Sequence, residues 1–189
     1  VLGGTVMGFV FGVLRAVAPP WINALLGAVL DVFRSIPLLI QFILANSFKS
    51  IVGLDVSAFT VACVVLAIYT SAYCAEIVRA GMLAVPTTTR RAARSLGMTW
   101  WQDLRYIVFP IALRVSLPSW VGLTLGVMKD TSLVLWIGIV ELLRASQVIV
   151  TRIQEPLLVL MLCGLIYFLM SYPISRLGAY LESRWRDDD

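Results

Sequence analysis

Residues 85–110 read VPTTTRRAARSLGMTWWQDLRYIVFP and lie between two strongly apolar halves of the chain. This insert carries four arginines and a single acidic residue, Asp103. Basic segments between membrane helices are retained on the cytoplasmic side. We therefore expect a hydrophobic chain that presents a short, helix-prone, positively charged insert to something in the cytoplasm.

The composition of the whole chain indicates an integral membrane protein. Its 189 residues are 60% hydrophobic and 14% charged, whereas soluble domains average roughly 45–50% apolar and about 25% charged. The net charge of +4 comes from arginines at the ends of apolar segments, which is typical of membrane topology and not of nucleic-acid binding. The chain has no histidine, so we expect no His-based catalysis and no metal site.

Five apolar segments are candidates for crossing a bilayer, whose core of about 30 Å needs about 20 helical residues. The clearest two, 57–75 and 156–175, carry no charge. The five apolar segments together predict an all-α, polytopic helical bundle of about five transmembrane helices in one domain, residues 1–189. The five segments are residues 2–18, 21–48, 57–75, 114 to about 140, and 156–175.

The placement of arginines predicts the orientation of the bundle. The insert and the region after the last span, with Arg176, Arg184 and Arg186, are expected in the cytoplasm. The C-terminus is then cytoplasmic, residues 49–56 and 141–155 face the outside, and the N-terminus is extracytoplasmic.

Within the insert, the capping residues predict two short helices. Pro86 ends the third span, and Thr87, Thr88 and Thr89 are candidate N-caps for a helix over 90–96. Gly97 is a left-handed stop, and Thr99 caps a second helix over 100–108, which Pro110 ends. From the residues alone, this insert is equally well interpreted as a lipid anchor with Trp100 and Trp101 at the interface.

The insert resembles the cytoplasmic loop by which permeases of ABC importers dock on their ATPase subunits. That loop has Glu-Ala-Ala, three residues, Gly, nine residues and Ile-x-Leu-Pro. Here the same spacing gives Arg91-Ala92-Ala93, Gly97 and Ile107-Val108-Phe109-Pro110. The motif's Glu is replaced by Arg91 and its Leu by Phe109.

Flanking segments are similar to the polar amino acid permeases of the histidine, glutamine and glutamate type. Residues 33–41, FRSIPLLIQ, resemble that group's FRGTPLLVQ. Residues 71–81, SAYCAEIVRAG, and residues 129–133, KDTSL, resemble its segments before the loop and in the fourth span. The resemblance covers most of the chain after about residue 30.

The resemblance implies the transmembrane subunit of an ATP-driven importer in a bacterial cytoplasmic (inner) membrane. It also implies two ATPase subunits, a second permease that is the same chain or a paralogue, and an extracytoplasmic solute-binding protein. No GxxxxGKS or GxxxxGKT loop occurs, so ATP and Mg²⁺ belong to the ATPase and this chain binds no cofactor. The implied docking residues are Arg90, Arg91, Ala92, Ala93, Gly97, Ile107 and Pro110.

Polar residues within apolar spans are candidates for a substrate path, because a charge in mid-membrane costs about 2.5–3.5 kcal/mol. Gln41 follows Arg34 by seven residues, which predicts a shared helix face. Structural alternatives remain open: Arg34 stabilises a bend at Pro37, Lys129 and Asp130 neutralise each other or charges on neighbouring helices, and Thr131 and Ser132 satisfy carbonyls at a helix break. The path candidates are Arg34, Gln41, Lys129, Asp130, Thr131 and Ser132.

Two further patterns have a structural interpretation. Glu76 and Arg79 are three residues apart and are expected to pair locally. Gly4, Gly8 and Gly12 form two overlapping GxxxG steps, which predict a close helix contact either within the chain or between subunits.

Three other functions compete with the importer. A membrane enzyme lacks support because the chain has no histidine and no GxSxG motif. A secondary transporter or a membrane scaffold, neither driven by ATP, is the main alternative.

Overall fold

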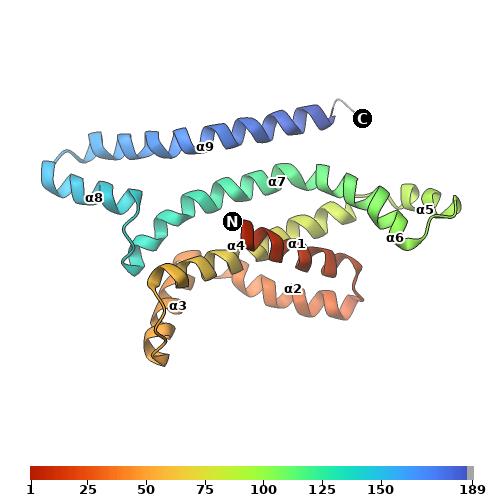
Figure 1. Cartoon of the computed structure of the whole chain (residues 1–189), viewed down its shortest axis with the longest axis horizontal. Coiled ribbons are helices and arrows are strands. Elements are labelled where there is room, and N and C mark those ends of the chain that lie inside the picture. The colour runs from red at the N-terminus through yellow and green to blue at the C-terminus, as the bar shows by residue number, and fades with distance from the viewer. Residues whose placement is uncertain (187–189) are drawn as a thin grey trace.

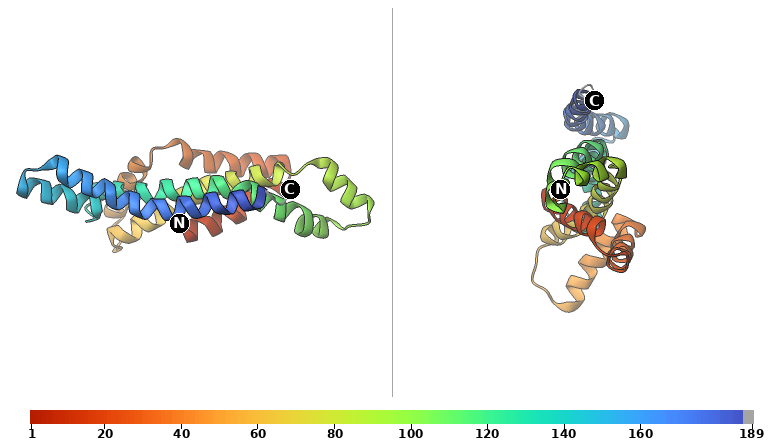
Figure 2. Two further views of the ribbon diagram at one scale, coloured as in Figure 1. Left: turned by 90° about the horizontal axis from the view of Figure 1, so that it is seen from above. Right: turned by 90° about the vertical axis from the view of Figure 1, so that its right-hand side faces the viewer.

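The computed structural model describes residues 1–186, and every regular element in this range is helical. The helices form an elongated bundle in which α4, α7 and α9 run along the long axis (Figures 1 and 2). In chain order the elements are α1 Leu2–Val17, α2 Pro20–Ser35, α3 Leu38–Val52, α4 Ala58–Leu83, α5 Thr87–Ser95, α6 Trp100–Asp103, the π-helical turn η1 Leu104–Val108, α7 Phe109–Asp130, the 3₁₀ segment η2 Thr131–Ile137, α8 Leu142–Ile153 and α9 Pro156–Arg186.

Three helical runs of the described chain are long and apolar enough to cross a membrane: Ala58–Leu83, Trp100–Ile137 and Pro156–Trp185. The pair α2 and α3 has the composition of one further span, and α1 is a shorter apolar helix. The predicted all-α membrane bundle with about five apolar segments is therefore confirmed.

The second apolar segment, residues 21–48, is bent at Pro37, as one of the structural alternatives for this segment predicts. α2 and α3 meet at an angle of 97°. Pro37 disfavours helical geometry in the residue before it, and Ile36 is accordingly extended, with φ −88° and ψ 128°. The proline therefore breaks the span into two helices.

The glycines of α1 form a contact within the chain. A Cβ at Gly8 would lie 2.5 Å from the Cβ of Cys74, and one at Gly12 would lie 2.6 Å from the carbonyl oxygen of Ala75. Such distances require glycine. The GxxxG steps thus place α1 directly against α4, which settles the alternative between intrachain and intersubunit packing for this face of α1.

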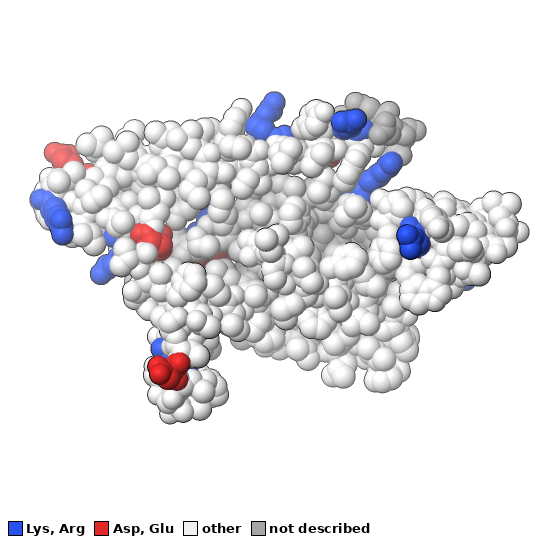
Figure 3. Space-filling model, viewed as in Figure 1, with Lys and Arg blue, Asp and Glu red and all other residues white. Residues whose placement is uncertain are grey.

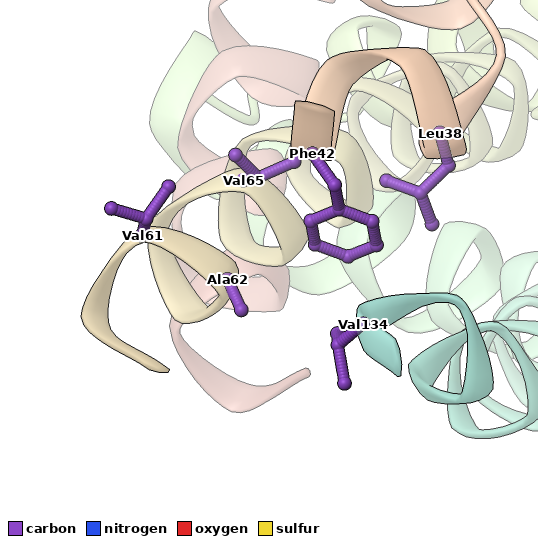
Figure 4. Close-up of a cluster of buried hydrophobic side chains, with 6 residues drawn as sticks. All are labelled: Leu38, Phe42, Val61, Ala62, Val65 and Val134. Atoms are coloured by element: carbon purple, nitrogen blue, oxygen red, sulfur yellow. The ribbon is translucent and has the colours of Figure 1, made fainter. Parts of the chain in front are cut away.

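Two clusters of buried apolar side chains hold the ends of the bundle together. One joins α3, α4 and η2, where Phe42 is fully buried (Figure 4). The second packs Met82 and Val85, at the end of α4, against Leu104, Val108 and Ala112. It therefore anchors the base of the basic insert to two long helices.

Two groups of elements lie at opposite ends of the bundle. α5, α6 and the C-terminal end of α9 lie at one end, and α8 lies at the other (Figures 1 and 2). α1 runs from near the middle of the long axis toward the end that holds α5 and α6. Charged atoms on the face in Figure 3 lie mostly toward the ends and rims, with a broad uncharged expanse between them.

Candidate functional site

The basic insert forms a helical hairpin, residues 85–110, built largely by its own capping residues. Gly97 is left-handed, with φ 84°, and its neighbour Met98 donates its N–H to the carbonyl of Ala93 at 3.3 Å. Thr99 and Gln102 form a reciprocal capping box, in which the Thr99 N–H donates to Gln102 Oε1 at 2.7 Å. The predicted glycine stop and the Thr99 cap are both confirmed.

Two details of the predicted hairpin are wrong. The first helix begins at Thr87, directly after Pro86, and no threonine side chain caps it. Pro110 does not end the second helix, because it is only the second residue of α7. Pro110 lies just after the π-helical turn η1, and such a local change of helix geometry accommodates a proline, which has no N–H to donate. The helical run therefore continues from Trp100 to Ile137.

The single acid of the hairpin is buried at its centre. Asp103 has 0% exposure, and its Oδ2 accepts hydrogen bonds from Arg90 Nε at 3.1 Å and Arg90 Nη2 at 2.9 Å. Arg94 Nη2 lies 3.7 Å from the same oxygen. Asp103 Oδ1 is buried without a hydrogen-bond partner among the described residues. Charge-assisted bonds of this kind are among the stronger ones in proteins, so Asp103 joins α5 to α6.

Sequence reasoning did not single out Asp103 as a site residue. Its separation of 13 residues from Arg90 matches no helical or strand repeat. The only available signal was that one acid stood among four arginines.

The seven predicted docking residues divide between the surface and the base of the hairpin. Ala93 is buried, and Ile107 packs on the apolar cluster below the hairpin. Arg91, Ala92, Gly97 and Pro110 are exposed. A hollow of about 180 Å³ on the surface is lined by Thr87, Arg90, Arg91 and Arg94.

A second charged group, the ion cluster, surrounds Glu76 on α4. The predicted local pair of Glu76 with Arg79 is confirmed. The same carboxylate also pairs with Arg15 of α1 at 2.9 Å and lies 3.7 Å from Arg34 of α2. Arg15 Nε donates in addition to Asn23 Oδ1 at 3.1 Å. Glu76 therefore connects three helices. The sequence did not indicate this role, because Arg15 and Glu76 are 61 residues apart.

Arg34 and Gln41 lie on different helices at the elbow between α2 and α3, so the expected shared helix face is wrong. Gln41 Nε2 donates to the carbonyls of Phe33 at 2.7 Å and Ile36 at 2.8 Å. The Arg34 guanidinium lies 5.5 Å from the ring centre of Tyr73, whose hydroxyl donates to the Arg34 carbonyl at 3.3 Å. Gln41 therefore stabilises the bend, whereas Arg34 holds the end of α2 against Tyr73 of α4.

The other path candidates lie where α7 changes into η2. Thr131 Oγ1 donates to the Met128 carbonyl at 2.7 Å, so it satisfies a carbonyl at a helix break. Lys129 is exposed and makes no ion pair with Asp130 within residues 1–186. Successive helical residues point about 100° apart, so mutual neutralisation of these neighbours is wrong.

η2 and the elbow are neighbours in space. Val134 of η2 packs with Leu38 and Phe42 of α3 (Figure 4). The structure thus brings the two groups of path candidates to adjacent elements, without a hydrogen bond between the groups in the part of the chain described.

Comparison with known proteins gives the family. Residues 4–187 match the family of binding-protein-dependent transport system inner membrane components. The chain belongs to this family. The permease is 31% identical over 189 residues to the glutamine transport system permease protein GlnP of Escherichia coli strain K12, covering 97% of this chain and 85% of that protein. It is 35% identical over 161 residues to the nopaline transport system permease protein NocM of Agrobacterium fabrum, covering 80% and 67%.

Solved structures agree with this family. The permease matches a chain in the crystal structure of an amino acid ABC transporter with histidines, with a TM-score of 0.87 and 32% identity over 97% of this chain and 86% of that chain. The MetNI methionine ABC transporter in an inward-facing conformation shares the fold, with a TM-score of 0.74 at 23% identity, covering 95% and 88%.

Membership of the family defines the role of the permease. It is an inner membrane translocation subunit that catalyses no reaction itself, and ATP is used by a separate ATPase subunit. Such permeases work with ATPase subunits and binding proteins. The alternatives of a secondary transporter and a scaffold are not favoured by these relatives.

Proposed function

We propose that the permease forms half of the translocation path of an importer for polar amino acids or related small solutes. Relatives named for glutamine, for nopaline and for glutamate and aspartate support this substrate class. The other half of the path is a second copy of the chain or a paralogue. Two ATPase subunits dock on the hairpins, and a solute-binding protein delivers the substrate at the α8 end.

The observation that carries this proposal is the continuous helical run Trp100–Ile137. At 1.5 Å per residue, its 38 residues extend roughly 55 Å. The run begins in the hairpin and ends in η2, beside the elbow. A displacement of the hairpin by an ATPase is therefore carried as a rigid-body movement to the far end of the bundle.

The substrate path in this proposal lies beside η2 and the elbow. Lys129 attracts a carboxylate, and Asp130 and Ser132 offer groups for an ammonium. Arg34 already pairs with Asp31 and lies 3.7 Å from Glu76, so it adds positive charge beside the path and holds the elbow in place. Gln41 and Thr131 support the backbone around them, because their side chains already bond to carbonyls. The hairpin end and the C-terminus of α9 share one end of the bundle, which supports a cytoplasmic C-terminus.

Reconstitution tests the proposal. The permease is placed in proteoliposomes with its co-expressed ATPase and binding protein, and uptake of labelled glutamine, glutamate, histidine and nopaline is measured. We expect uptake of at least one of them only with ATP on the ATPase side. Uptake driven by an ion gradient without ATP would overturn the proposal.

A further inference from the structure

The hairpin presents basic side chains and no acid to its surroundings. Asp103 is its sole acid, and the surface does not expose it. The side chain of Arg94 is 53% exposed, and Arg91 and Arg105 are exposed as well. Arg91 makes no ion pair within residues 1–186. The outer face therefore carries uncompensated positive charge.

The hairpin also exposes apolar area and has a recess. Leu96 is 85% exposed and Trp101 is 72% exposed, at the tip where α5 turns into α6. The hollow lined by Thr87, Arg90, Arg91 and Arg94 has a volume of about 180 Å³, which is large enough for a carboxylate side chain. Arg90 is hydrogen-bonded to Asp103, and Arg94 lies 3.7 Å from the same oxygen but is 53% exposed. The unpaired charge at the hollow therefore belongs to Arg91, with the exposed guanidinium of Arg94 beside it.

We propose that the hairpin docks into an acidic groove of the ATPase subunit, with a carboxylate of the ATPase entering the hollow between Arg91 and Arg94. This inference rests on the proposed ATPase docking and specifies the chemistry of the partner surface. The permease motif that the hairpin resembles has Glu at the position of Arg91. Like charges across an interface exclude wrong partners, so Arg91 disfavours an ATPase whose groove is basic. This hairpin therefore selects an ATPase whose groove is acidic.

The position of the hairpin favours a protein partner over lipid. The hairpin extends beyond α4 along the long axis of the bundle (Figures 1 and 2), and this axis is the direction of the long apolar helices. Its base is fixed by the cluster of Met82, Leu104 and Val108. The basic surface is thus carried away from the apolar belt.

Charge reversal at Arg91 tests the inference without disturbing the fold, because this side chain is exposed and unpaired among the described residues. The dissociation constant for the purified ATPase subunit is measured with the permease in nanodiscs, at low and high salt. We expect Arg91→Glu to weaken binding about tenfold at low salt. Screening should reduce the difference to about twofold at 0.5 M salt.

Arg144→Glu is the matched control. Arg144 is exposed on α8, at the opposite end of the bundle, and the substitution makes the same change of net charge. We expect an unchanged dissociation constant for this variant. Equal or tighter binding of Arg91→Glu relative to the unsubstituted permease would overturn the inference.

A photoreactive amino acid at Leu96 identifies the neighbour of the hairpin directly. In proteoliposomes containing anionic lipid and the ATPase, we expect crosslinks to the ATPase. Crosslinks to lipid alone would overturn the inference in favour of a membrane anchor. If the permease transports with ATP while Arg91→Glu binds the ATPase normally, the inference fails and the proposed function stands. If the unsubstituted permease does not bind the ATPase, the proposed function fails with it.

Discussion

Asp103 and Arg90 face each other across the hairpin, and the guanidinium of Arg90 donates two hydrogen bonds to one oxygen of a fully buried carboxylate. This pair crosses between two helices whose only covalent link is a short turn at Gly97. The hairpin transmits a displacement from the ATPase to the long helices only if it moves as a rigid body. Such a cross-connection between its two helices is therefore required, because a flexible hairpin would bend instead. Asp103 therefore acts as a positioning residue for the hairpin.

Asp103→Asn should loosen the hairpin. Removing the charge leaves Arg90 half-buried without its counter-ion, at a cost of about 1–3 kcal/mol. Hydrogen exchange of residues 87–108 should become faster by roughly 5–150-fold, since 1.4 kcal/mol is a factor of ten, while α9 is unaffected. The control is Asp55→Asn at an exposed position. Unchanged protection of the hairpin would contradict a bracing role.

Glu76→Gln should destabilise the whole permease more than neutralisation of the nearby Asp31 does. Three arginines lose their shared counter-ion, and the Arg15 side chain is only 8% exposed. Removing one partner of a buried ion pair costs about 3–5 kcal/mol. The cost is smaller here because the Glu76 side chain is partly exposed. The midpoint of thermal unfolding in detergent should fall by several degrees, which is roughly 2–4 °C per kcal/mol for a chain of this size.

The comparison variant for Glu76 is Asp31→Asn. Asp31 contacts Arg34 at 3.0 Å, but its side chain is 58% exposed, so its pair is worth at most about 1 kcal/mol. An equal fall in the unfolding midpoint for both variants would show that the ion cluster is not centred on Glu76.

Gly8→Ala should separate α1 from α4. The added methyl group would lie 2.5 Å from Cys74 Cβ and 2.8 Å from the Ser71 carbonyl, so the helices must move apart at a cost of about 1–3 kcal/mol. Gly3→Ala is the matched control, since nothing lies within 4 Å of its added Cβ, and alanine favours a helix by up to about 1 kcal/mol. The unfolding midpoint should fall for Gly8→Ala and stay or rise for Gly3→Ala. A rise for both would contradict the close contact.

Lys129→Ala tests the proposed substrate path. If Lys129 binds the substrate carboxylate, its loss removes a charged hydrogen bond worth about 1.5–3 kcal/mol. The KM for uptake should then rise roughly 10–100-fold while association with the ATPase is unchanged. Lys49→Ala, in the last turn of α3, should leave the KM unaltered. A lower maximal rate with an unaltered KM would remove Lys129 from the path.

Local signals in the sequence predicted the hairpin well. The Gly97 turn and the Thr99–Gln102 capping box involve residues a few positions apart, and their effects act through the backbone of the same turn. The same reasoning placed the third and last spans, because long uncharged runs have few alternatives in a bilayer. It failed at Pro110, which follows a π-helical turn inside a continuous helix. It also failed for the shared helix face of Arg34 and Gln41, because the span bends by 97° between them.

By itself, the sequence determined an all-helical membrane protein with a basic hairpin between its spans, because hydropathy and helix capping depend only on residues near one another. Only the tertiary structure decided that Asp103 lies inside the hairpin, that Arg15 reaches Glu76, and that the glycines of α1 meet α4. Asp103 and Arg90 are 13 positions apart, and Arg15 and Glu76 are 61 positions apart. Their existence depends on how the helices pack, which no local pattern encodes.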